Sequence, residues 1–181
     1  MSEITIKGIY RDQLWDPSHK LIFDSDWRSN LIVMNCRILL AGFIKNDLDP
    51  DPAKGAKGIQ YMEVGFGESV WDTNPPDTKI SNTTSSLVNP SPNKIKPPNF
   101  LKLHYLDENE VKTSVPTNRI EIVATLGPGQ PTPATDPPYQ LREFGLFGML
   151  NNTPYMIDYV RHPLIEKDGA LTLERRVRLI F

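Results

Sequence analysis

The chain has 181 residues but only one cysteine, Cys36, and no apolar run that approaches the roughly 18 residues needed for a membrane-spanning helix. One cysteine cannot form a disulfide within the chain. The opening residues MSEITIKG also lack the basic and then apolar layout of a signal peptide. We therefore expect synthesis and assembly in the cytoplasm, without membrane insertion.

An excess of charge of one sign is missing as well. The 20 basic and 22 acidic residues give a formal net charge of −2, which offers no general electrostatic reason to bind nucleic acid or anionic membranes. A length of 181 residues fits one domain, because domains usually have roughly 100 to 200 residues. We therefore expect a single soluble domain that spans residues 1–181, with no nucleic-acid partner.

The usual marks of an active site or a metal site are absent. His19, His104 and His162 lie far apart in the sequence, without the short spacings that mark zinc ligands. Gly65–Ser69 lacks the Lys-Ser/Thr ending of a phosphate-binding loop, and no serine lies in a Gly-x-Ser-x-Gly motif. Cys36 falls on an apolar helix face, where a buried structural thiol is expected. We therefore expect no catalytic residues, no metal and no cofactor, and we expect His162 to be a surface or turn residue.

Proline, in contrast, is abundant, with 17 in the chain. The prolines gather in residues 49–52, 74–77, 89–98 and 127–138. Because proline fixes φ and removes a backbone donor, these clusters mark connections between strands. The pattern predicts a long loop over residues 72–99 and a Pro-rich loop over residues 127–138. Loops of such length usually serve binding or are mobile.

One stretch, residues 26–46, has helical rather than strand periodicity. Ser25 and Asp26 are candidate caps, and apolar residues recur behind them at spacings of three and four. The members of this stripe are Trp27, Leu31, Met34 and Ile38, with Ile32, Leu39 and Phe43 on a neighbouring stripe. The broad apolar face predicts a core helix that lies on a sheet, and an oligomer contact is the alternative.

Alternation of apolar and polar residues predicts strands through most of the remaining chain. We expect a mainly β (α+β) fold, an antiparallel sheet or sandwich of about 6–8 strands with one main helix and long Pro-rich loops. The expected strands lie at Ile4–Tyr10, Leu21–Phe23, Gly58–Gly67, Leu101–Tyr105, Val111–Val115, Ile120–Leu126, Gln140–Phe147, Tyr155–Arg161 and Leu171–Phe181.

The last expected strand, Leu171–Phe181, has an apolar face and a charged face. Arg176 and Arg178 lie on the charged face, whereas Arg175 breaks the alternation. We expect the charged face to be solvated. An anion or nucleic-acid patch is one alternative, and an interface that pairs its arginines with a neighbour's carboxylates is another.

Four segments carry a resemblance to a known family. They are a strand with the ending Val-Gly-Phe-Gly at Ile59–Gly67, a Pro/Thr-rich stretch at Pro75–Leu87, an Arg-Ile-Glu segment at Arg119–Ala124 and the motif Leu-Arg-Glu-Phe-Gly-Leu-Phe at Leu141–Phe147. In this order they resemble the N-terminal attachment domains of bacteriophage tail-collar and tail-fibre proteins. They also resemble small proteins encoded with phage-tail-like contractile injection systems. The motif at Leu141–Phe147 is the most specific part.

The resemblance implies a non-enzymatic structural adaptor that docks on a tail, baseplate or cap ring. Its implied partners are further copies of itself, in a ring or trimer, and other tail, baseplate or cap proteins. The implied location is the bacterial cytoplasm during assembly and then a virion or injection particle. Because the chain stops at Phe181 without a shaft, we expect an adaptor rather than a fibre that reaches a receptor.

Nine residues are candidates for the interface or for assembly. Arg142 and Glu143 are expected to pair or cap within the domain, and Gly145 to permit a bulge or a close backbone approach. The aromatic candidates are either anchors for a partner or members of the core. The full set is Trp15, Trp71, Tyr139, Arg142, Glu143, Phe144, Phe147, Arg176 and Arg178. A second hypothesis is a soluble β-domain that binds a small ligand or carbohydrate through its long 72–99 loop.

Overall fold

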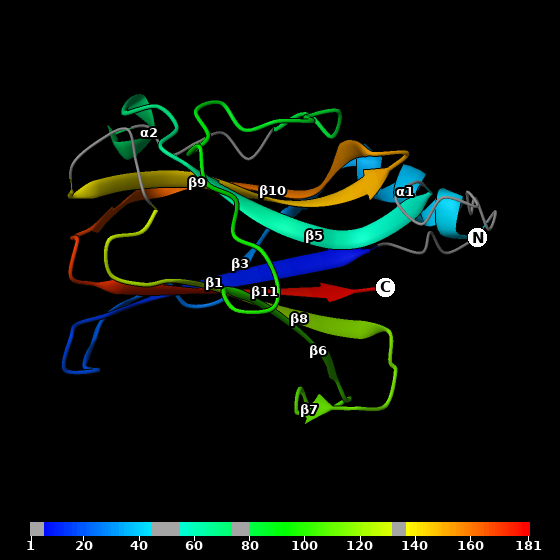
Figure 1. Ribbon diagram of the computed structural model, residues 1–181, viewed down its shortest axis with the longest axis horizontal. Coiled ribbons are helices and arrows are strands. Elements are labelled where there is room, and N and C mark those ends of the chain that lie inside the picture. The colour runs from blue at the N-terminus through cyan, green and yellow to red at the C-terminus, as the bar shows by residue number, and fades with distance from the viewer. Residues whose placement is uncertain (1–5, 45–54, 74–79, 132–136) are drawn as a thin grey trace.

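Two antiparallel β-sheets face each other in the computed structural model, which describes residues 6–44, 55–73, 80–131 and 137–181 (Figure 1). The larger sheet contains β1 (Lys7–Trp15), β2 (Leu21–Asp24), β3 (Arg28–Ser29), β6 (Leu101–Leu106), β7 (Lys112–Thr113), β8 (Arg119–Leu126) and β11 (Thr172–Ile180). The smaller sheet contains β4 (Leu31–Ile32), β5 (Ala56–Gly65), β9 (Tyr139–Leu150) and β10 (Thr153–Lys167). The predicted mainly β fold is confirmed.

The strand orders bring distant parts of the chain together. The larger sheet runs β2-β1-β11-β8-β6-β7, with β3 also paired to β1, and the smaller sheet runs β4-β10-β9-β5. Residues near the two ends of the chain are therefore direct neighbours, with Lys7 opposite Ile180 in the β1–β11 pair. Such non-local pairing explains why the sequence pattern predicted strands but not their partners.

The main core lies between the sheets. Alternate residues of β1 and β11 are buried, as the period of two requires for strands with one covered face. Leu173, Val177 and Leu179 of β11 face this core, together with Phe144 and Leu146 of β9. The predicted apolar face of the last strand is therefore correct, and Arg175 lies on that same buried face.

The predicted helix at residues 26–46 begins too early. The structure places β3 and β4 before α1 (Met34–Ile44), and residues 45 and 46 lie outside the described part of the chain. Asp26 has a φ of 56°, and the Ser25 hydroxyl accepts a hydrogen bond from the Asp12 amide instead of capping a helix. Pairing with β1 and β10 outweighs the helical spacing in this stretch.

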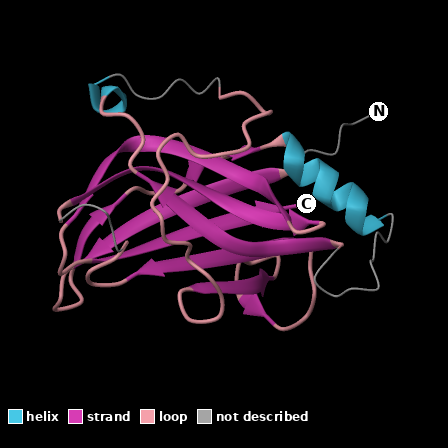
Figure 2. Ribbon diagram, turned by 45° about the horizontal axis from the view of Figure 1, so that its top comes forward, coloured by secondary structure: helices cyan, strands magenta, loops and turns pink. Residues whose placement is uncertain are grey.

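Helix α1 packs at one end of the sandwich, against β5, β9 and β10 (Figure 2). Cys36 and Leu39 are buried, so the predicted structural thiol is confirmed. Met34, Ile38 and Phe43 on the same helix remain exposed. The broad apolar face is therefore covered only in part.

The other strands agree with the predicted positions but differ in length. β9 and β10 are longer than expected, whereas the strand predicted at Val111–Val115 is reduced to the two residues of β7. Val111 and Val115 are 59% and 64% exposed, so no burial stabilises a longer strand there. Ile4, in the predicted first strand, lies outside the described residues.

Candidate functional site

Glu143 lies at the centre of the candidate site. Its side chain is fully buried in β9 and accepts three hydrogen bonds. The donors are the Asn89 amide at 2.7 Å, the Val88 amide at 3.0 Å and the Tyr159 hydroxyl at 2.7 Å. Burial and the hydrogen bond to Glu143 raise the pKa of Tyr159, so its hydroxyl stays protonated as a donor. One carboxylate thus attaches the segment around residue 88 to the smaller sheet.

Two glycines leave room for this contact. A Cβ on Gly65 would lie 2.6 Å from Oε1 of Glu143 and 2.8 Å from the Asn89 carbonyl oxygen. A Cβ on Gly145 would lie 3.0 Å from a methyl carbon of Leu87. The predicted close backbone approach at Gly145 is confirmed by the Asp158 carbonyl oxygen, which lies 3.1 Å from that Cβ. The Leu87 methyl belongs to the chain segment that Glu143 holds.

Arg142 fixes a second segment, the short helix α2 (Val70–Thr73). Its Nε and Nη2 atoms donate to the two carboxylate oxygens of Asp72 at 2.9 and 2.8 Å, and Nη1 donates to the Phe66 carbonyl at 3.1 Å. The Arg142 guanidinium lowers the pKa of Asp72, whose carboxylate also accepts the Leu164 amide at 3.1 Å. This bidentate pair joins α2 to β9 and β10.

Trp71 completes the attachment of α2. The ring is 6% exposed, and the Arg161 guanidinium lies 4.9 Å from its centroid. Arg161 also donates from Nε to the Tyr159 hydroxyl at 3.0 Å. The stacked guanidinium therefore connects α2 to the same hydrogen-bonded group that contains Glu143.

Residues 80–96, called the connecting segment below, lie over the smaller sheet and along its edge (Figure 1). Leu87 packs in a second hydrophobic cluster with Val33, Tyr61, Phe147, Met156 and Tyr159. Further along, Met62 and Ile95 exchange two backbone hydrogen bonds of 2.9 Å. The connecting segment thus pairs with the outer edge of β5, which would otherwise present free backbone groups.

We expect Glu143→Gln to loosen the connecting segment, because a glutamine side chain presents only one acceptor oxygen to three donors. The amides of Val88 and Asn89 should exchange hydrogen faster, and the free energy of unfolding should fall by about 1–3 kcal/mol. Hydrogen exchange measured by mass spectrometry on peptides from residues 80–96 checks this. Glu166→Gln, at an exposed position of β10, is the matched control, and equal exchange in both variants would contradict the role of Glu143.

A separate buried group of polar side chains joins the two sheets. Arg175 in β11 donates from Nε and Nη2 to the Asp12 carboxylate in β1, at 2.5 and 3.0 Å. Its Nη2 also lies 3.0 Å from Nε2 of His162 in β10, and its guanidinium lies 4.0 Å from the centroid of the Phe144 ring. Arg175, which breaks the alternation of the last strand, therefore connects the two sheets through the core.

His162 is buried, so its prediction as a surface or turn residue is wrong. Its Nδ1 lies 2.7 Å from the Pro163 carbonyl oxygen and must carry the hydrogen, while Nε2 faces the Arg175 guanidinium and must accept. Both contacts therefore require the neutral ring. Burial and the charge of Arg175 lower the pKa of His162 to about 4.

Asp158 is a further buried ionisable group in β10. Its Oδ2 accepts a 2.7 Å hydrogen bond from Nδ2 of the Asn30 side chain, at the point where the chain passes from β3 to β4. Burial raises the pKa of Asp158 to about 8, against an ordinary value of 3.8. Asp158 is therefore protonated at neutral pH, and its Oδ1 atom has no hydrogen-bond partner among the described residues.

Arg176 and Arg178 lie on the outer face of the larger sheet, and both are paired within the chain. Glu121 is 1% exposed and accepts from Nη1 of Arg176 at 3.3 Å and from Nε of Arg178 at 3.0 Å. Glu174 and Glu110 complete the two ion pairs. The charged face is thus a ladder of both signs rather than a basic patch.

The aromatic candidates are distributed differently from the charged ones. Tyr139, Phe144 and Phe147 are no more than 4% exposed, and Trp15 is half-buried at the end of β1. Phe147 stacks on Tyr61 with ring centroids 5.0 Å apart. Burial leaves little surface for direct contact with a partner on Tyr139, Phe144, Phe147, Trp71, Arg142 and Glu143. Any part that these residues have in assembly acts through the segments that they hold.

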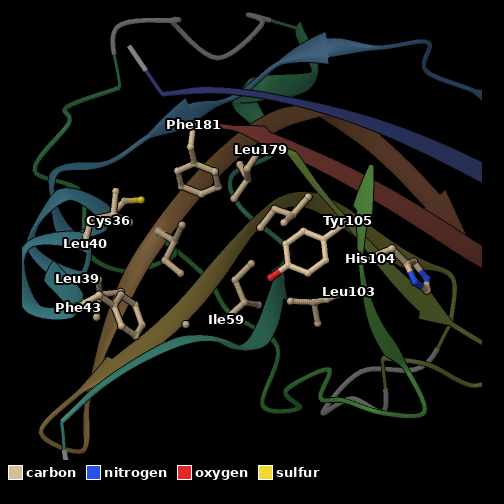
Figure 3. A pocket seen from close by; sticks show the side chains of 13 residues that line it. Cys36, Leu39, Leu40, Phe43, Ile59, Leu103, His104, Tyr105, Leu179 and Phe181 are labelled. Carbon is tan, nitrogen blue, oxygen red and sulfur yellow. The ribbon is translucent and has the colours of Figure 1, made fainter. Parts of the chain in front are cut away.

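A third feature, an apolar pocket of about 330 Å³, was not predicted from the sequence (Figure 3). It lies between α1, β5 and the inner faces of β6, β8 and β11. The larger sheet extends beyond the smaller one at β6 and β7, so Leu103 and Tyr105 are 41% and 39% exposed. Alternation places such residues on the inner face, but it does not reveal that the opposite sheet ends before them.

Comparisons of the chain with protein-family models, with curated proteins and with solved structures gave no match. Within residues 6–44, 55–73, 80–131 and 137–181, no three His, Cys, Asp or Glu side chains gather in a way that would hold a metal ion. None of the helices in those ranges has the length and apolar character needed to cross a membrane. The resemblance to tail-collar domains therefore stays a prediction from the sequence.

Proposed function

We propose that this protein is a non-enzymatic structural adaptor of a bacteriophage tail or of a phage-tail-like contractile injection particle, which docks on a tail, baseplate or cap ring. The observation that carries the proposal is that the motif at Leu141–Phe147 fixes two other chain segments on the smaller sheet. Arg142 and Glu143, its two charged residues, hold α2 and the connecting segment on the smaller sheet. A rigid sandwich thereby presents an otherwise extended segment in one conformation.

This arrangement suits docking, because ordering a loop before binding lowers the entropy lost on association. The connecting segment bears several exposed residues beyond its buried anchors Leu87 and Ile95, among them Val88 and Lys96. Its outer surface is therefore the docking surface that we assign. Self-association into a ring or trimer belongs to the same proposal, with α1 and its exposed apolar residues as a second contact region.

The second hypothesis, a carbohydrate or small ligand bound by the long 72–99 loop, has less support. The pocket to which Asn93, Lys94 and Ile95 contribute has a volume of only about 40 Å³. Ligand pockets usually have volumes of roughly 300–1,000 Å³. A sugar ring would find little enclosure there.

If the adaptor proposal holds, purified tail or injection particles from the bacterium that carries the gene should contain the protein in a fixed ratio to a tube or sheath protein. Mass spectrometry of intact particles measures this ratio. Amine labelling adds a test of the docking surface, since Lys96 should be protected in the particle and reactive in the free protein. Lys20, in the exposed turn after β1, is the comparison site. Absence of the protein from intact particles would overturn the proposal.

A further inference from the structure

The apolar pocket beside α1 takes no part in the Arg142–Glu143 network, and the docking surface assigned to the connecting segment does not include it. We propose that it binds one neutral, single-chain amphipathic molecule, an alkyl chain with a hydroxyl or similar polar end group. The argument rests on the size of the pocket, on the chemistry of its lining and on the exposure of its rim.

The volume sets the size of the ligand. A buried apolar cavity of about 150 Å³ accepts one benzene ring, so a pocket of twice that volume has room for about ten to twelve carbon atoms. The observed 330 Å³ also falls within the usual range for small-molecule pockets. An α-helix of a partner protein is about 10 Å across and needs an extended groove, so it does not fit this space.

The lining sets the charge of the ligand. Among the described residues that line it, none is Asp, Glu, Lys or Arg, and the apolar members come from α1, β5, β6, β8, β10 and β11. Burial raises the pKa of the Cys36 thiol to about 11, so the thiol is uncharged. Burial and nearby Lys112 lower the pKa of His104, so its ring is neutral at any pH above its ordinary pKa of 6.5. A charged head group would lose its hydration here without gaining a partner.

Tyr105 supplies a polar end to the pocket. Its hydroxyl points into the space between the sheets, while Ile59 and Leu103 approach from either side (Figure 3). The phenol both donates and accepts, which suits a hydroxyl on the ligand. Phe43, Leu103 and Phe181 form an apolar rim and are each about two-fifths exposed, so the pocket is open to entry.

The test uses the normal alkanols from hexanol to dodecanol, titrated into the full chain by calorimetry. Affinity should rise about fourfold with each added methylene, the change that about 0.8 kcal/mol per buried methylene gives, and should level off near ten to twelve carbons. Leu103→Glu places a carboxylate in the lining at an exposed position that tolerates it, and should weaken decanol binding at least tenfold. Val115→Glu, at a more exposed position outside the pocket, should bind decanol as the unaltered chain does.

Three outcomes would overturn the assignment. One is decanol binding that Leu103→Glu leaves unchanged, and another is an affinity that does not depend on chain length. The third is a sedimentation experiment in which the unaltered chain is a dimer, Leu103→Glu is a monomer and neither binds decanol, because a second copy would then cover the pocket. Particle composition plays no part in these measurements, so they succeed or fail independently of the adaptor proposal.

Discussion

Arg175→Met is expected to lower the free energy of unfolding by about 3–5 kcal/mol, because it leaves the Asp12 carboxylate buried without its cation. Both side chains are at most 1% exposed, so water cannot replace the lost partner. The variant also removes the donor to Nε2 of His162 and the cation above the Phe144 ring. Urea denaturation followed by circular dichroism at pH 6 measures the change.

The neighbouring residue provides the matched control. Arg176 lies on the opposite face of β11, and its side chain is 31% exposed in its ion pairs. Arg176→Met should therefore cost no more than about 1 kcal/mol. If Arg175→Met and Arg176→Met destabilise the protein equally, the buried pair does not have the structural part assigned to it.

A double variant separates the ion pair from its surroundings. Asp12→Leu with Arg175→Met removes both charges at once and fills the site with apolar groups of similar size. The double variant should lose clearly less free energy of unfolding than the two single variants lose in sum, because it leaves no unpaired buried charge. Additive losses would show that the two residues act independently.

Much of the β structure could be predicted because the covered faces of the strands follow a period of two. β11 is the clearest case, with Leu173, Val177 and Leu179 on the core face. The start of the main helix could not be predicted, because residues 28–32 form strand pairs with β1 and β10 instead of a first helical turn. β1 precedes these residues in the sequence, and β10 follows more than 100 residues later. Local periodicity contains no information about such partners.

The candidate site shows the same limit. The motif at Arg142 and Glu143 was recognisable, but its partners Asp72, Val88 and Asn89 lie 54 to 70 residues away. The break in alternation at Arg175 was also visible, whereas Asp12 lies 163 residues away. Long-range partners of this kind are fixed by the fold and not by sequence spacing.

His162 was mispredicted for a more local reason. A histidine before a proline suggested a turn at the end of a strand. In the structure β10 continues to Lys167, and an irregularity in its pairing with β9 between Arg161 and Ile165 accommodates Pro163 at an exposed position. A bulge thus turns His162 into the core within an unbroken strand.

The pH dependence of stability should reveal His162 and Asp158 together. His162 has its pKa lowered from 6.5 to about 4, so its contribution is complete above pH 6.5 and is lost as the pH falls toward 4. Asp158 has its pKa raised from 3.8 to about 8, so its contribution is complete below pH 3.8 and is lost as the pH rises toward 8. From pH 4 to 6.5 the two slopes oppose each other, and stability should be nearly constant.

Above pH 6.5 the His162 slope ends while the Asp158 slope continues, at about 1.4 kcal/mol per pH unit for one proton. The free energy of unfolding should therefore fall by about 2 kcal/mol between pH 6.5 and pH 8. Asp158→Asn keeps the shape of the side chain and removes this slope, leaving that of His162. Its stability should rise from pH 4 to 6.5 and then stay level, whereas that of the unaltered chain stays level over the first range and falls over the second.

Urea titrations at half-unit intervals from pH 4 to pH 8 distinguish these two profiles. Glu108→Gln, at an exposed turn position, is the control and should follow the unaltered chain throughout. A decline above pH 6.5 that persists in Asp158→Asn would assign the slope to another group. Both residues lie in β10 and the positive charge of Arg175 acts on both, so the two profiles together would assign both slopes to this strand.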